Sequence, residues 1–303
     1  MSPDEKLVEY NKRGLIPGPS ETNGQFYQRV DFCEKFFLDP ASFFSEFSLK
    51  DRIKRQDLDW VYAKLIKTYD IAPDFLVAFY SNKDLYFFQG ACTWIFEHNK
   101  ISLAVVQLRE RLNDKKYFFY DREEILTHEM AHLARMAFDE KSEEVFAYLL
   151  SSSFFRRAFG AIIQNEKEVL LFFLFFFSSL ICFIFSLSPL FSIFSSITTG
   201  ILSWGLFRLF KKKYRLWRSA KNLLKIVKKE KWVRAILFRM TDKEIAQFAK
   251  WNIEKILSYI KKEKSLRWRM IYLSYFAKIK QGNAHGKKDP NHRSKKRKPG
   301  SNV

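Results

Sequence analysis

The feature that most constrains this chain is a run of thirty-nine residues without a charged side chain, from Val169 to Phe207. One crossing of a bilayer takes about 20 apolar residues, so the run is long enough for two crossings. Ser188-Pro189 interrupts it near the middle, where proline removes an amide donor and disfavours helix at the preceding residue. We therefore predict a hairpin of two transmembrane helices, 169–187 and 190–209, within a segment 167–210.

The net charge of +20 is distributed unevenly around this hairpin. Residues 1–170 carry a net charge of −4, whereas residues 211–303 carry +23. Basic residues flank the hairpin on both sides and none lies in its turn, so the positive-inside rule predicts that both ends face the cytoplasm. The charged N-terminus has no apolar h-region, so we expect no cleavable signal peptide. The expected location is a membrane, with two transmembrane helices and both termini cytoplasmic.

The basic residues after the hairpin suggest an anionic partner. The pattern of residues 211–280 predicts amphipathic helices in which tryptophans alternate with lysines and arginines, and residues 281–303 read as a disordered basic tail. Aromatic and basic residues together can bind nucleic acid. An ordinary solvated helical bundle is a second alternative. A basic segment that begins at a membrane exit is better explained by an anionic lipid surface. We therefore expect a membrane partner and no nucleic acid.

The part before the hairpin, residues 1–166, has mixed patterns that predict an α+β domain. Three cysteines without a short spacing exclude a disulfide scaffold and a cysteine-based zinc ribbon, and no glycine-rich phosphate loop occurs. The periodicity predicts a loop, helices and three or four strands joined by hairpin turns. The expected segments are a loop at 14–24, helices at 50–69, 122–137 and 141–158, and strands within 75–106, including 91–96 and 101–106 and a short candidate at 85–88.

The chemistry-bearing feature is His128-Glu129-Met130-Ala131-His132. Residues four apart lie one turn above each other on the same face of a helix, so both imidazoles can bind one metal ion. Glu129 projects beside them, where it can take a proton from a water molecule at the metal. The motif therefore predicts a Zn²⁺ centre with His128 and His132 as ligands and Glu129 as the catalytic general base.

The surroundings of the motif support a rigid helix and a third ligand. Asp121 is an expected N-cap, with Glu124 three residues further on as its capping-box partner. From residue 125 to residue 134 only Glu129 is charged, as in a helix buried against a sheet. A catalytic zinc ion takes three protein ligands and leaves a fourth position open. Glu144, twelve residues after the motif, is the expected third ligand, and Glu143 is the alternative.

Residues from about Phe75 to Ala158 resemble the zincin metallopeptidases, and more closely the gluzincins. In that family a glutamate from the next helix completes the zinc site, often followed by alanine three residues on, and Glu144-Val-Phe-Ala147 matches that setting. The strand pair 91–96 and 101–106 resembles the zincin sheet, whose edge strand holds an extended peptide substrate. The resemblance implies a zincin-like domain with a small sheet, an active-site helix and a ligand helix.

The sequence also departs from the gluzincin pattern. Many gluzincins place an aspartate four residues after the ligand glutamate, where it orients a ligand histidine, and this chain has Tyr148 there. Asp139 or Glu140 is the expected substitute. No motif marks the group that stabilises the transition state. Tyr148, Tyr120 and His98 are candidates for contact with the substrate or the transition state.

Two functions follow from these observations. The first is a membrane-anchored zinc metalloendopeptidase, a hydrolase of protein or peptide substrates in which Glu129 is the general base. The second is a non-enzymatic pseudoenzyme, whose hairpin presents cytoplasmic domains to protein partners or anionic lipid. Its hairpin resembles those of inclusion-membrane proteins of intracellular bacteria. A zinc site with measurable turnover would favour the first function.

Overall fold

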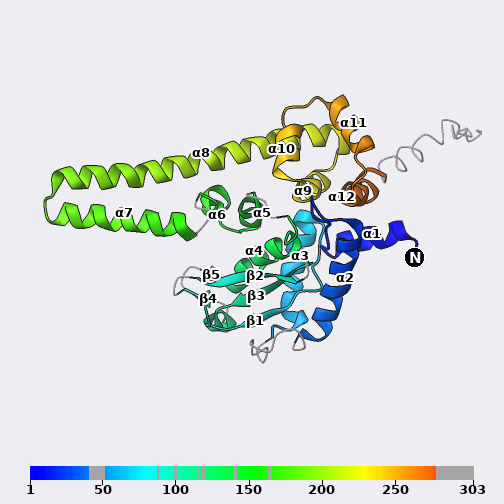
Figure 1. The fold of residues 1–303 in the computed structure, drawn as a ribbon, viewed down its shortest axis with the longest axis horizontal. Helices are drawn as coiled ribbons and strands as arrows, with labels where there is room; N and C mark the ends of the chain where they lie inside the picture. The colour runs from blue at the N-terminus through cyan, green and yellow to red at the C-terminus, as the bar shows by residue number, and fades with distance from the viewer. Residues whose placement is uncertain are drawn as a thin grey trace, which may run out of the picture.

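The computed structural model describes residues 1–40, 52–86, 89–98, 101–114, 116–117, 120–138, 142–162 and 166–277. In these residues the chain is mostly helical, with a small three-stranded sheet and two long apolar helices (Figure 1). This confirms the coarse prediction of a mixed first part, a helical hairpin and a helical final part. The prediction of a tail at 281–303 concerns residues outside those described.

Two capped helices open the chain. Helix α1 spans Pro3–Lys12 and helix α2 spans Asn23–Leu38, each begun by a capping box. The predicted loop lies between them. Helix α3 spans Asp59–Tyr69, with its first turn replaced by a 3₁₀ segment at Arg55–Leu58, so it begins later than the sequence predicted.

The sheet contains a hairpin and one parallel strand. Strands β2 (Ala91–His98) and β3 (Ile101–Leu108) form the predicted antiparallel pair. Strand β1 (Ala78–Tyr80) pairs with β3 in parallel, which the expected hairpin turns did not anticipate, and the order is β1-β3-β2. Residues 85 and 86 form no strand, and residues 87–88 lie outside those described. Strand β2 is therefore an edge of this sheet.

The parallel pairing is accompanied by hydrogen bonds between the residues that follow β1 and the end of β3. The amide of Ser81 donates to the carbonyl of Leu108 at 2.8 Å. The buried Gln107 side chain donates to the carbonyls of Ser81 and Lys83 at 3.0 and 2.7 Å. These bonds hold the loop after β1 against the end of β3. Strand β3 therefore lies between β1 and β2, parallel to β1 and antiparallel to β2.

Helix α4 (Arg122–Ala134) carries the His128–His132 motif and packs against β2 and β3. A 3₁₀ segment (Glu110–Asp114) and a two-residue strand pair, β4 (Lys116–Tyr117) and β5 (Tyr120–Asp121), lead into it. Its apolar residues are buried, as the uncharged surroundings of the motif predicted: Ile125, Leu126, Met130, Ala131, Leu133 and Ala134.

The predicted helix at 141–158 is divided into α5 (Glu143–Leu149) and α6 (Phe154–Phe159). The break falls at three consecutive serines, where Ser151 Oγ and the amide of Ser152 donate to Glu124 of α4. Ser153 caps α6 by accepting from the amide of Arg156. A contact between distant parts of the sequence therefore ends α5.

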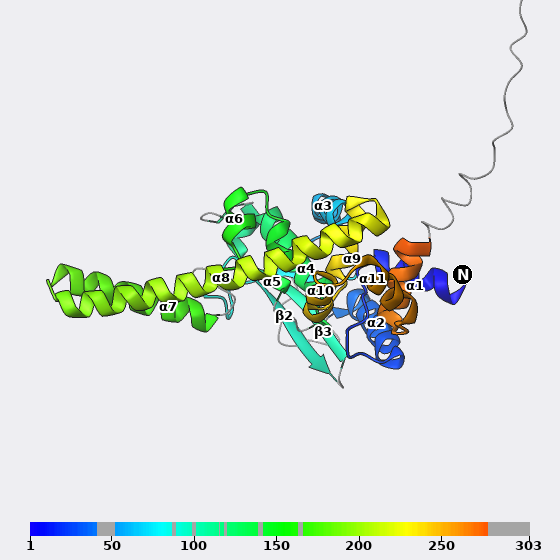
Figure 2. The same ribbon diagram turned by 90° about the horizontal axis from the view of Figure 1, so that it is seen from above.

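Helices α7 (Glu166–Ile184) and α8 (Ser188–Val227) form the predicted hairpin and are long and apolar enough to cross a membrane. They pack together and project away from the rest of the molecule (Figure 1, Figure 2). Arg208 pairs with Glu168 at 2.6 Å, joining the first charges on either side of the uncharged run. Helix α8 continues past the predicted end at 209 as one helix of 40 residues.

Four short helices follow: α9 (Glu230–Phe238), α10 (Asp242–Phe248), α11 (Ile253–Lys262) and α12 (Leu266–Ile271), with a π-helical turn at Tyr272–Phe276. The capping box of Thr241 and Glu244 is present as predicted. Trp268 is buried in the bundle with 1% of its surface exposed, whereas Trp217 on α8 has 56% of its surface exposed.

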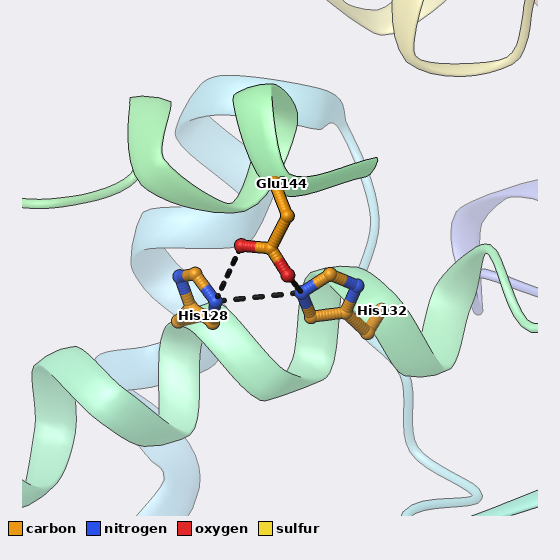
Figure 3. Close-up of side chains that lie close together, drawn as sticks. All are labelled: His128, His132 and Glu144. Carbon is orange, nitrogen blue, oxygen red and sulfur yellow. Dashed lines mark hydrogen bonds and ion pairs between the residues drawn. The ribbon is translucent and has the colours of Figure 1, made fainter. Parts of the chain in front are cut away.

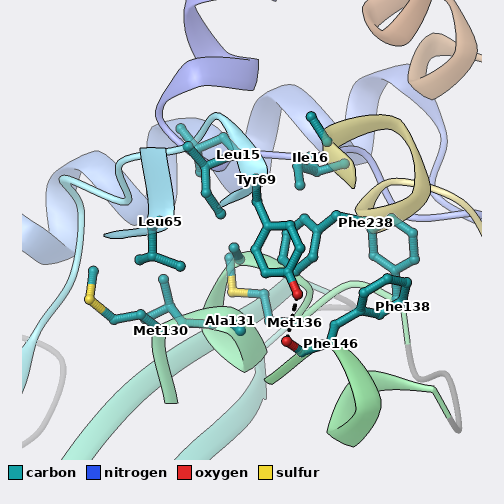
Figure 4. Close-up of a cluster of buried hydrophobic side chains, with 14 of the residues drawn as sticks. Leu15, Ile16, Leu65, Tyr69, Met130, Ala131, Met136, Phe138, Phe146 and Phe238 are labelled. Atoms are coloured by element: carbon teal, nitrogen blue, oxygen red, sulfur yellow. Dashed lines mark hydrogen bonds between the residues drawn. The ribbon is translucent and has the colours of Figure 1, made fainter. Parts of the chain in front are cut away.

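The final helices share one hydrophobic core with the first part of the chain. Tyr69 of α3 stacks on Phe238 of α9 with ring centroids 4.2 Å apart. Its hydroxyl donates to the carbonyl of Phe146 in α5 at 2.6 Å (Figure 4). Helix α9 therefore packs behind α5, the helix that carries the expected third ligand.

Candidate metal centre

Helices α4 and α5 bring three expected ligands together. His128 and His132 lie one turn apart on α4, and Glu144 reaches them from α5 (Figure 3). The two Nε2 atoms are 3.4 Å apart. Glu144 Oε2 lies 3.6 Å from His128 Nε2, and Glu144 Oε1 lies 3.4 Å from His132 Nε2. The side chains of three residues on two successive helices thus lie around one small space.

The donor set fits a zinc ion. Zinc bonds to histidine nitrogen and carboxylate oxygen are about 2.0–2.2 Å long, so two ligands of a tetrahedral site lie about 3.3–3.5 Å apart. The observed separations of 3.4 to 3.6 Å are close to this range, with a different Glu144 oxygen facing each histidine. Two imidazoles and one carboxylate are also the ligand types of a catalytic zinc site, which keeps its fourth position open.

The same three side chains interact strongly in the protein without metal. Burial lowers the pKa of His132, but hydrogen bonds to Glu143 and Glu144 overcome this effect and raise the pKa to about 10. Burial raises the pKa of Glu144, and the hydrogen bonds from His128 and His132 outweigh it, so this pKa lies well below its usual value of 4.5. A metal ion must therefore displace a proton from the His132 imidazole.

Glu143 occupies a different position from its neighbour. It lies 3.6 Å from His132 Nδ1, the ring nitrogen that faces away from Glu144, and 3.8 Å from Nε of the buried Arg135. Arg135 donates through Nη1 to the carbonyls of Phe238 and Met240 beyond the hairpin. A carboxylate at the second imidazole nitrogen fixes the orientation of a ligand histidine. The expected substitutes, Asp139 and Glu140, lie outside the described residues.

Glu129 is held beside the two histidines by strand β2. Thr93 Oγ1 donates to Glu129 Oε2 at 2.6 Å, which leaves Oε1 available. The same hydroxyl lies 3.4 Å from the Glu129 carbonyl. Sequence reasoning missed Thr93, although a polar residue inside the aromatic and β-branched run 91–96 was a usable signal. The bond places the edge strand next to the expected general base.

The structure describes some of the other predicted residues, which are the candidates for substrate contact and the expected cap of α4. The Tyr148 ring packs edge-on against the His128 ring, with centroids 4.6 Å apart. The side chains of Tyr120 and His98 lie outside the described part of the chain. Asp121 caps α4 by accepting from the amide of Glu123 at 3.0 Å. Glu124, expected to complete a capping box, instead accepts from Ser151, Ser152 and Arg156.

A cavity of about 640 Å³ leads to the site. His128 and Glu129 lie in its wall with Tyr148 and the start of β2. Its lining also includes Arg156 of α6, Gly160 directly after α6, and Val169 and Phe173 of the first turns of α7. The cavity therefore extends from His128 and Glu129 to the base of the apolar hairpin. Comparisons with protein-family models, curated proteins and solved structures gave no match for this chain.

Proposed function

We propose that this chain is a membrane-anchored, zinc-dependent metallopeptidase with a zincin-like domain. The observation that carries the proposal is the convergence of His128, His132 and Glu144 on one space, with Glu129 beside them in the wall of one cavity. The resemblance of His128–His132 and of Glu144–Ala147 to the gluzincin motifs supports it.

The chain supplies the ligands and the proton transfer. His128, His132 and Glu144 would hold the ion, which when bound polarises the scissile carbonyl and makes water more acidic. The Glu129 carboxylate accepts the water proton and delivers it to the leaving amine, so that no covalent bond forms between enzyme and substrate. Thr93 orients this carboxylate through its hydrogen bond to Oε2.

The edge strand β2 supports peptides as the substrate class. An extended peptide can pair with the free backbone groups of an edge strand. The bond between Thr93 and Glu129 puts that edge next to the general base. A peptide paired with β2 would therefore present a carbonyl near His128 and Glu129.

The hairpin α7–α8 anchors this domain in a bilayer in the proposed function. Its large apolar side chains are exposed, including Phe177 and Phe183 at 52% and 65%. Both ends of the hairpin leave on one side, where Lys211, Lys212 and Lys213 follow. The positive-inside rule places this side, and with it the catalytic domain, in the cytoplasm.

Glu129→Gln tests the proposed chemistry. Glutamine keeps the shape of the side chain but cannot accept the proton, so we expect hydrolysis of a peptide library to fall by about 100-fold or more. Zinc content should be unchanged. Glu9→Gln, an exposed change on α1, is the matched control and should cleave like the wild-type chain. Undiminished cleavage by the Glu129→Gln chain would refute the assigned role.

A further inference from the structure

The short helix α6 exposes an unusual aromatic surface. Phe154 and Phe155 have 68% and 73% of their surface exposed, and Phe159 has 40%. The Phe154 and Phe155 rings contact each other edge-on at 5.9 Å. No residue of α6 is buried. Contiguous exposed aromatic side chains mark a site of contact with a membrane or with another protein.

Bonds to the hairpin fix where α6 lies along it. Lys213 Nζ donates to the carbonyls of Arg157 and Ala158 at the end of α6, both at 2.6 Å. Lys213 lies six residues after the uncharged run of α8 ends. Arg208, the first charge after that run, donates to the carbonyl of Ile162 at 3.2 Å. Helix α6 is therefore held at the level where the hairpin changes from apolar to charged.

The charges at this level favour an anionic surface. Lys211, Lys212 and Arg215 follow the apolar part of α8. Aromatic side chains are enriched at the boundary between the bilayer and water, and basic residues near it are attracted to anionic lipids by about 1 kcal/mol each. The aromatic surface of α6 therefore lies at the level of the hairpin where these basic residues begin.

We propose that α6 is an interfacial helix whose Phe154 and Phe155 side chains insert at the headgroup level of the bilayer that the hairpin crosses. This rests on the membrane anchor of the proposed function and is independent of its peptidase activity. Arg156 of α6 and Gly160, which follows α6, line the cavity together with Val169 and Phe173 of α7. Seating α6 in the interface therefore places one wall of the active-site cavity against the membrane surface.

Site-specific photocrosslinking tests this placement in the full chain. Benzoylphenylalanine replaces one residue at a time in chains reconstituted into nanodiscs of phosphatidylcholine and phosphatidylglycerol. The positions are Phe155, Phe177 in the middle of α7, and Leu38. Leu38 is 80% exposed and ends α2, which lies at the opposite end of the molecule from the hairpin turn (Figure 1, Figure 2). Illumination is followed by mass spectrometry of lipid adducts.

We expect lipid adducts at positions 155 and 177 and none at position 38. Adducts at position 177 alone would overturn the inference while leaving the membrane hairpin in place. Absence of adducts at both 155 and 177 would overturn the inference together with the proposed anchor. Crosslinking of position 155 to a second copy of the chain would also overturn it, because the aromatic surface would then be a protein interface.

Discussion

Glu143 and Glu144 are adjacent in the sequence but contact opposite sides of the same imidazole. Glu144 faces Nε2 of His132 and Glu143 faces Nδ1. The motif spacing was enough to predict His128 and His132, because an i, i+4 pair on a helix is a local feature. Thr93 and Arg135 could not be predicted in the same way. Their roles depend on contacts with residues 36 and 103 positions away.

Glu143→Gln should weaken zinc binding without removing it. The amide keeps the size of the side chain but loses the charge that orients His132, and loss of such a partner typically lowers metal affinity about 10- to 100-fold. Competition with a fluorescent zinc chelator measures this affinity. Glu9→Gln should leave it unchanged. Equal affinity in the Glu143→Gln and wild-type chains would show that Glu143 does not orient the ligand.

The metal-free chain should lose stability as the pH rises. His132 has a folded pKa of about 10 against an ordinary value of 6.5, so its stabilising contribution is complete below pH 6.5 and is lost as the pH rises through about 10. The lowered pKa of Glu144 contributes stability above pH 4.5 that is lost on acidification. Thermal unfolding after chelator treatment, from pH 6 to 10, should show a declining midpoint that His132→Gln flattens. The same decline in His132→Gln would contradict this account.

At the scale of helices and strands, the sequence predicted the elements that have a strong local pattern of apolar and polar residues. The hairpin, α4 and the β2–β3 pair are of this kind. The parallel strand β1, the break between α5 and α6 and the full length of α8 were not predicted. The bonds from Gln107 to the loop after β1 and from Ser151 to Glu124 explain the first two. They join segments whose proximity no periodicity reveals.

The packing of α6 against α5 predicts an effect of Gly160. A β-carbon at this position would lie 2.3 Å from Cδ1 of Tyr148, whose ring packs on His128. Gly160→Ala should therefore destabilise the fold by about 1–3 kcal/mol and weaken zinc binding. Gly24→Ala is the control, because a β-carbon there meets nothing within 4 Å. Unchanged unfolding temperature and zinc affinity in Gly160→Ala would argue against this packing.

At the scale of the whole molecule, the helices beyond the hairpin pack behind the candidate metal centre. The sequence separated residues 1–166 from residues 211–280 because the hairpin and the change in charge lie between them. Helix α9 packs on α3, its Phe238 ring contacts the Phe146 ring of α5, and Arg135 donates to the carbonyls of Phe238 and Met240. The charge pattern of a sequence indicates which segments face water or lipid. It does not indicate these buried contacts between segments. Zinc binding is therefore best measured on the full chain.

The central claim is that His128, His132 and Glu144 hold one zinc ion. Elemental analysis of the full chain, purified in detergent and dialysed against buffer with limiting free zinc, tests it most directly. We predict one zinc ion per chain in the wild type and in His292→Ala, and close to none in His128→Ala. Substoichiometric zinc in the wild-type chain, or one zinc ion retained by His128→Ala, would contradict the claim.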